Sequence, residues 1–255
     1  MIDVHAHLTD RRFAEDVSDV LIRARRAGVV RVLTAAEDVE SSEAAIALAR
    51  AHDDVRVAVG VHPHRAETWG PATLETLTRL AHEESVVAIG EVGMDLSGRS
   101  APPEAQERAL RAQIALASLL DLPVVLHVRD SGARVRAVLR DGPDVRGMVH
   151  CYSEGPEEIP VWLELGFALS FAGTVTYPGN DELRAAAARA PLDQLFAETD
   201  SPYLAPQNVR GQRNEPRYVA ATYAALARER RADLGELAAA IARNARQLFG
   251  WRWGT

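Results

Sequence analysis

Histidines and carboxylates follow short apolar segments at several points in the chain, and these residue types are common ligands of divalent metals in enzymes. His5 and His7 lie in the first such segment, two residues apart. Residues two apart in an extended strand point to the same side, so both imidazoles can share one metal ion. The pair alone is a weak indication, because two histidines near a terminus can also be surface residues.

Glu91 follows the apolar residues AIG, where a buried carboxylate is costly unless a cation compensates its charge. The two oxygens of a carboxylate can bridge two divalent ions. The chain contains no lysine, so a carboxylated lysine cannot provide such a bridge. We therefore expect Glu91 to be a bridging and catalytic residue. The alternative is a buried carboxylate that pairs with an arginine.

His127 in VVLHVRDS and His150 in GMVHCYS each follow an apolar run. A lone histidine there is more often a hydrogen-bonded core residue, but two on neighbouring strands favour a second metal site. Asp200 in FAETDSP can hold a metal through one oxygen and take a proton through the other. The alternative for Asp200 is a capping role, because Asp-Ser-Pro is also typical of turns.

The expected cofactor is a pair of divalent ions, Zn²⁺, Mn²⁺ or Mg²⁺, and mixed nitrogen and oxygen ligands suit the first two better. A metal lowers the pKa of a bound water from about 15.7 to about 7, and two metals can stabilise the attacking and leaving oxygens of a phosphodiester. These residues therefore predict a metal-dependent hydrolase.

Substrate contacts are expected from side chains near the same strand ends. His62 and His64 flank Pro63 after the third apolar run, and Arg129 lies two residues beyond His127. A guanidinium fork matches phosphate oxygens, and loops after the last strands of a barrel often form a phosphate site. The predicted substrate-binding residues are His62, His64, Arg129, Arg210 and Arg213. The alternative for His62 and His64 is a loop histidine without a role, and that for Arg210 and Arg213 is a solvated loop charge.

The elements that must position these residues alternate regularly along the chain. Eight apolar runs, most of them rich in Val, Ile and Leu, cover residues 2–4, 30–34, 55–61, 86–90, 123–128, 147–149, 167–171 and 194–197. Segments of helical period cover residues 13–27, 41–52, 72–83, 103–120, 133–140, 181–190, 215–230 and 234–249. This alternation predicts an α/β fold, a (β/α)₈ TIM-type barrel with residues 1–255 as a single domain. The C-terminal ends of all its strands would meet at one face.

Composition limits the possible partners. Of the 255 residues, 47% are hydrophobic and 25% are charged, and the formal net charge is −7. That charge argues against a broad basic surface for nucleic acid, so a phosphate must meet local arginines or metal ions. The single cysteine, Cys151, excludes an internal disulfide and is expected to point away from the site. With no apolar run near the length of about 18 residues that spans a bilayer, we expect a cytoplasmic protein without membrane contact or an obligate protein partner.

The chain resembles the TatD family of metal-dependent deoxyribonucleases, within the amidohydrolase-like barrels. The matching stretches are DVHAHL, GVHPH, GEVGMD, LPVVLHVRDS, VHCYS, SFAGTVTY, ETDSPYLAP and RGQRNEP, in this order over almost the whole chain. The resemblance implies one metal held by His5, His7, Glu91 and Asp200, and a second held by Glu91, His127 and His150. It also implies hydrolysis of phosphodiester bonds in DNA, with single-stranded DNA or 3′ ends as the substrate.

The departures from the family fall on loops at the mouth of the barrel. After Asp95 the chain reads LSGRS, without the usual aromatic residue, so base stacking there would be lost. Glu154 replaces a common glycine and would repel a phosphate if it pointed inward, and Tyr152 replaces a common Phe. Two other functions stay open: hydrolysis of a small ester, lactone, amide or phosphoester, and a non-catalytic scaffold. The scaffold is disfavoured because no expected ligand is missing.

Overall fold

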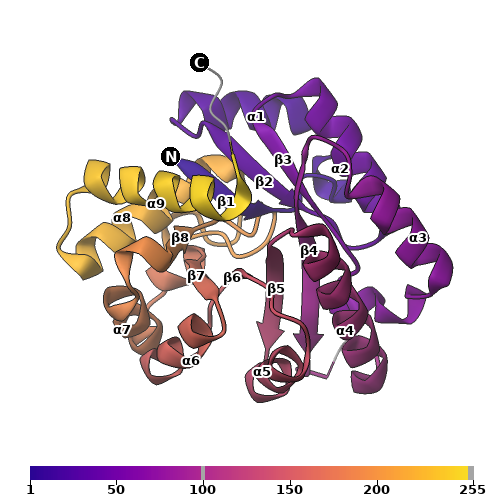
Figure 1. The fold of residues 1–255 in the computed structure, drawn as a ribbon. Coiled ribbons are helices and arrows are strands. Elements are labelled where there is room, and N and C mark those ends of the chain that lie inside the picture. Colours follow the sequence, from indigo (N-terminus) through magenta and orange to yellow (C-terminus); the bar gives the residue numbers. More distant parts are fainter. Residues whose placement is uncertain (99–100, 252–255) are drawn as a thin grey trace.

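Eight parallel strands pair in chain order, from β1 to β8, and enclose the centre of the molecule (Figure 1). The structure is a computed structural model that describes residues 1–98 and 101–251. The strands are β1 (Ile2–Ala6), β2 (Arg31–Ala35), β3 (Val55–Val59), β4 (Val86–Asp95), β5 (Val124–Arg129), β6 (Gly147–Val149), β7 (Phe167–Phe171) and β8 (Leu195–Ala197). The predicted (β/α)₈ barrel is confirmed.

Helices lie outside the strands and follow one another around the barrel (Figure 1). They are α1 (Val17–Arg26), α2 (Val39–Ala51), α3 (Pro71–Leu80), α4 (Pro103–Leu120), α5 (Gly132–Asp141), α6 (Ile159–Glu164), α7 (Asp181–Arg189), α8 (Val219–Arg230) and α9 (Leu234–Phe249). The last helix returns to contact β1, and Gly250 ends it with a φ of 64°. None of the helices in the described ranges is long and apolar enough to cross a membrane.

Two elements differ from the sequence prediction. Helix α6 was not predicted, because it has only six residues and carries a proline in its first turn. Strand β4 runs on to Asp95 instead of ending at residue 90, since its second half also pairs with β5, where Asp95 lies opposite Arg129. Glu91 is therefore inside the strand, at a register shift between Ile89 and Val92.

The barrel closes between β1 and the segment that follows β8. The backbone N–H of Asp200 donates to the carbonyl of His5 at 2.9 Å, and the N–H of His7 donates to the carbonyl of Ser201 at 2.7 Å. These two hydrogen bonds carry the sheet around to its first strand. They also place Asp200 beside His5 of β1 and His7, which follows it.

The inside of the barrel is polar near this closure. Asp3, Ser170 and Glu198 are fully buried. The carboxylate of Asp3 accepts hydrogen bonds from the N–H and the hydroxyl of Thr199, at 2.8 and 2.6 Å. Burial raises the pKa of Asp3 well above its ordinary value, although the hydrogen bonds from Thr199 oppose the rise. A polar interior is costly unless its groups are paired, so these contacts fix the backbone on both sides of the seam.

Candidate metal centre

Glu91 lies at the centre of the predicted site, with 1% of its surface exposed. Its Oε2 is 3.2 Å from Nε2 of His5 and 3.3 Å from Nε2 of His7. Its Oε1 is 2.6 Å from Nδ1 of His127 and 2.8 Å from Nε2 of His150. The structure therefore brings ligand candidates from β1, β4, β5 and the end of β6 to the two oxygens of one carboxylate.

The first group of donor atoms surrounds Oε2 of Glu91. Nε2 of His5 and Nε2 of His7 are 3.3 Å apart, and Oδ1 of Asp200 lies 3.7 Å from the first and 3.3 Å from the second. A tetrahedral ion with bonds of about 2.0 to 2.1 Å holds its ligands about 3.3 Å apart. The four donor atoms thus have the spacing that a divalent ion requires.

The second group surrounds Oε1 of Glu91. Nδ1 of His127 and Nε2 of His150 are 3.2 Å apart, so both nitrogens face the same oxygen. His62, which we expected to contact substrate, also reaches this group, with its Nε2 3.3 Å from Oε1. Its Nδ1 accepts the N–H of His64 at 3.1 Å, so the hydrogen of a neutral ring is on Nε2 and points at Glu91.

Unpaired polar atoms support the fit of a cation. Oε2 of Glu91 is buried and has no hydrogen-bond partner within the described residues. Nε2 of His5 and Nε2 of His7 face each other, and one hydrogen at most can lie between them. Burying such groups without compensation is costly, and a divalent ion among them would satisfy every lone pair at once. Three groups of described residues with metal-binding geometry share this region: His5–His7–Asp200, His5–His150–Glu198 and His62–Glu91–His127.

Outer contacts orient the imidazole rings. Nδ1 of His7 lies 3.2 Å from the carbonyl of Ala35, which can only accept, so the ring hydrogen is on Nδ1 and Nε2 presents a lone pair. Nε2 of His127 lies 3.5 Å from Oδ2 of Asp95, which leaves Nδ1 to face Glu91. Such outer polar contacts are typical of metal-binding histidines.

Glu198 supports His150 in the same way and was not predicted from the sequence. It is fully buried, and its Oε1 lies 3.1 Å from Nδ1 of His150 and accepts the N–H of Cys151 at 2.8 Å. Its Oε2 accepts the hydroxyl of Ser170. The available signal was its spacing, two residues before Asp200 in the stretch ETDSP.

The carboxylates of the site are held in their ionised form. Burial alone would raise the pKa of Glu91, but His150, His62 and His5 together hold it well below its ordinary value. Burial would also raise the pKa of Asp200, and the hydrogen bond with His7 outweighs it and lowers that pKa. Burial lowers the pKa of His62 to about 4, so this ring is neutral at pH 7.

The site opens into a cavity of about 430 Å³ at the C-terminal ends of the strands. Three of the residues predicted to contact substrate, His62, His64 and Arg129, line this cavity. The guanidinium group of Arg129 has no hydrogen-bond or ion-pair partner in the described part of the chain. Cys151 also lines the cavity, so the expectation that it points away is wrong. Its backbone is left-handed, with a φ of 45°, and this breaks the alternation of an extended strand.

Arg210 and Arg213 are not brought to the cavity. The guanidinium of Arg210 lies 4.3 Å from the ring centre of Tyr177. That of Arg213 pairs with Asp16 at 2.7 Å and with Glu215 at 3.1 Å. These contacts give Arg213 a structural role in joining the loop after β8 to the start of α1.

Glu154 does not point into the cavity. Its carboxylate pairs with Arg136 at 3.0 Å and accepts the indole N–H of Trp162 at 2.5 Å. Its charge is therefore neutralised outside the site. Arg99 and Ser100 of the LSGRS stretch lie outside the described residues.

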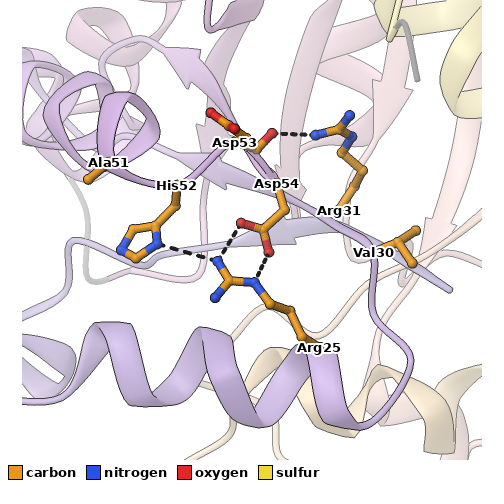
Figure 2. A pocket seen from close by; sticks show the side chains of 7 residues that line it. All are labelled: Arg25, Val30, Arg31, Ala51, His52, Asp53 and Asp54. Carbon is orange, nitrogen blue, oxygen red and sulfur yellow. Dashed lines mark hydrogen bonds and ion pairs between the residues drawn. The ribbon is translucent and has the colours of Figure 1, made fainter. Parts of the chain in front are cut away.

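A second cavity, of about 550 Å³, lies at the N-terminal ends of β2 and β3 (Figure 2). Arg25 makes a two-point ion pair with Asp54, at 2.8 and 2.7 Å, and lies 3.3 Å from Nδ1 of His52. The side chains of Arg25, His52 and Asp54 point toward one another (Figure 2). That end of a barrel generally serves stability, and none of the predicted site residues lies in this cavity.

An eight-stranded barrel that gathers histidines and carboxylates at the C-terminal ends of its strands is the arrangement expected of a metal-dependent hydrolase. A family model described as TatD related DNase matches residues 2–250, and the chain belongs to this family.

Individual relatives agree with this assignment over nearly their whole length. The chain is 38% identical to the 3′-5′ ssDNA/RNA exonuclease TatD of Erwinia tasmaniensis, covering 98% of this chain and 99% of that protein. It is 32% identical to the metal-dependent hydrolase YabD of Bacillus subtilis, with 98% of each chain covered. The solved structure of YJJV, a TatD homologue from Escherichia coli, aligns with a TM-score of 0.93 and 33% identity, covering 99% of this chain and 98% of that one.

Proposed function

We propose that this hydrolase removes nucleotides from the 3′ end of single-stranded DNA or RNA, with two divalent ions bound on either side of Glu91. The observation that carries the proposal is the shared carboxylate: each of its oxygens faces a separate pair of histidines at 2.6 to 3.3 Å. Two ions in this arrangement suit the in-line displacement at a phosphodiester. The printed name of the Erwinia relative, an exonuclease on single-stranded DNA and RNA, supports the same substrate.

The chain's own residues would hold the ions as follows. His5, His7, Asp200 and Oε2 of Glu91 hold the first, and His127, His150 and Oε1 of Glu91 hold the second. The bound ions supply Lewis acidity and make a water molecule acidic enough to ionise near neutral pH. Imidazole and carboxylate donors together favour Zn²⁺ or Mn²⁺ over Mg²⁺.

Asp200 is our proposed proton acceptor. It lines the cavity, and its lowered pKa keeps it ionised at neutral pH. Oδ1 faces His7 and His5, so the other oxygen is available to take a proton from the attacking water.

Arg129 and His62 would hold the phosphate. The guanidinium group of Arg129 lies at the cavity without a hydrogen-bond or ion-pair partner among the described residues, and its fork geometry fits two phosphate oxygens. His62 offers a neutral Nε2–H, which can donate to a phosphate oxygen without adding charge. With a net charge of −7, binding through such local contacts fits the chain better than a broad basic surface.

Digestion of 5′-labelled single-stranded DNA with added Zn²⁺, Mn²⁺ or Mg²⁺ tests the proposal. We expect stepwise shortening from the 3′ end, abolished in Asp200→Asn. The matched control is Asp181→Asn, an exposed carboxylate of α7 that pairs with Arg184, and it should retain full activity. Turnover of lactones, amides or small phosphoesters without digestion of DNA or RNA would contradict the nuclease function and favour the alternative hydrolase.

We also propose that residues 1–255 act as one domain in the cytoplasm. The single cysteine, Cys151, fits a reducing compartment. Fractionation of cells that express the tagged chain would test the location, and recovery outside the cytoplasmic fraction would contradict it.

A further inference from the structure

Tyr203 lies at the edge of the candidate metal centre and is not one of the proposed metal ligands. It lines the cavity, and 39% of its surface is exposed. The edge of its ring meets His7, with the ring centres 5.7 Å apart and the planes at 82°. Among the described cavity residues, Tyr203 is the only Phe, Tyr or Trp side chain.

Arg12 and Asp10 fix the orientation of this ring. The guanidinium carbon of Arg12 lies 4.1 Å from the ring centre of Tyr203. Asp10 holds Arg12 by two hydrogen bonds, at 2.9 and 2.8 Å, and accepts the hydroxyl of Tyr203 at 3.2 Å. A loop after β1 and a loop after β8 thus bring a cation over the face of an aromatic ring.

The opposite side of the mouth lacks an equivalent surface. Leu96 follows Asp95, where the family usually has an aromatic residue, and Leu96 packs against the hydrophobic core. Among the described residues that line the cavity, Tyr203 therefore offers a planar group the only six-membered aromatic ring, beside the imidazoles of the site.

We propose that Tyr203 and Arg12 form a stacking platform for one unpaired nucleobase next to the scissile phosphate, a subsite that rests on the proposed nuclease function. Stacking on an aromatic ring tolerates any base, and a nearby guanidinium adds a cation–π contribution. A base in a duplex is paired and stacked on its neighbours, so it must leave the helix to use the platform. The platform would thus select single-stranded ends and accept DNA and RNA alike.

A cycle of enzyme and substrate changes tests the platform. Wild type and Tyr203→Ala are compared on single-stranded DNA with a normal or an abasic nucleotide at the 3′ end or the position before it. Removing the base or the ring alone should lower kcat/KM by about 5- to 150-fold, the range expected for one base–aromatic stack. Removing both should lower it no further than either alone. Independent, multiplying losses at both positions would overturn the platform.

Three further variants separate stacking from structural damage. Tyr203→Phe should keep most of the activity, because the ring remains. Tyr203→Leu fills the space beside His7 without an aromatic face and should behave like Tyr203→Ala, with unchanged metal content. Tyr218→Ala removes another tyrosine that stacks on an arginine, Arg217 at 4.5 Å, outside the cavity, and should not affect the cycle.

A binding measurement keeps the platform testable apart from catalysis. A DNA strand with 2-aminopurine at its 3′ end should lose fluorescence when it binds to the Asp200→Asn variant. The double variant that also carries Tyr203→Ala should not show this quenching. If the fluorescence is quenched but the wild-type protein does not cleave DNA, the stacking platform is supported and the proposed nuclease function is refuted. Cleavage without Tyr203-dependent quenching would refute the platform alone, and the absence of both binding and cleavage would refute both.

Discussion

Glu198→Gln is the most informative change outside the ligands themselves. The glutamine oxygen can still accept from Nδ1 of His150 and from the N–H of Cys151, as Oε1 of Glu198 does at 3.1 and 2.8 Å. Its amide then faces Ser170, whose hydroxyl can rotate to accept. The substitution therefore removes one buried negative charge and keeps an acceptor for His150 and for the N–H of Cys151.

The loss should fall on the second ion. A carboxylate behind a metal-binding histidine makes that ring a stronger ligand, and removing it typically weakens metal affinity about 10- to 100-fold, or about 1.4 to 2.8 kcal/mol. The ring that Glu198 supports is His150, one of the ligands expected for that ion. His7 and Asp200 have no hydrogen bond to Glu198 in the described structure, so the first ion should lose less affinity.

Titration of the metal-free protein with Zn²⁺ against a competing chelator measures both affinities. We expect one of two binding steps to weaken in Glu198→Gln and the other to stay close to wild type. Glu154→Gln is the matched control, because Glu154 pairs with Arg136 outside the cavity and should leave both steps unchanged. Two unchanged steps in Glu198→Gln, or an equal loss in both, would refute the reasoning.

Three other predictions concern the frame around the site. In Gly93→Ala the new Cβ would lie 1.9 Å from the carbonyl oxygen of His127, so β4 must move away from β5. We expect the free energy of unfolding to fall by about 3 kcal/mol or more and the metal content to decrease. An unchanged thermal midpoint would contradict this prediction. Arg213→Ala removes ion pairs that are about one-third exposed and should lower the midpoint by about 2 to 4 °C with unchanged kcat/KM; loss of catalysis without loss of stability would instead favour substrate binding by Arg213. Hydrogen bonds from Arg213 and Arg23 lower the pKa of Asp16 from 3.8 to about 2, so these contacts stabilise the folded protein fully above pH 3.8 and lose that effect as the pH falls through 2. The difference in urea midpoint between wild type and Arg213→Ala should therefore become smaller between pH 3.8 and 2. A difference that stays constant would count against the ion pair.

The convergence of the ligands could be predicted because it follows from topology. In a barrel of parallel strands all C-terminal ends meet at one face, so His5, Glu91, His127, His150 and Asp200 needed only their place after apolar runs to be grouped. The helical and strand periods were sufficient to locate most of the elements.

Features that depend on local backbone geometry or on distant partners could not be predicted. Cys151 turns into the cavity because of one left-handed residue, which no apolar pattern signals. Arg213 is held by Asp16, 197 residues away in the chain. Glu198 acquires its role only when β6, β7 and β8 are placed side by side. In each case the sequence shows the residue but does not show which backbone conformation or distant side chain decides its role in the folded protein.

Anomalous X-ray scattering at the zinc edge, from crystals grown with Zn²⁺, tests the shared carboxylate most directly. We predict two peaks about 3.5 to 4 Å apart, one among His5, His7 and Asp200 and one beside His127 and His150, with an oxygen of Glu91 bound to each. Peaks only at other places on the molecule, or a Glu91 carboxylate that binds neither ion, would contradict the account.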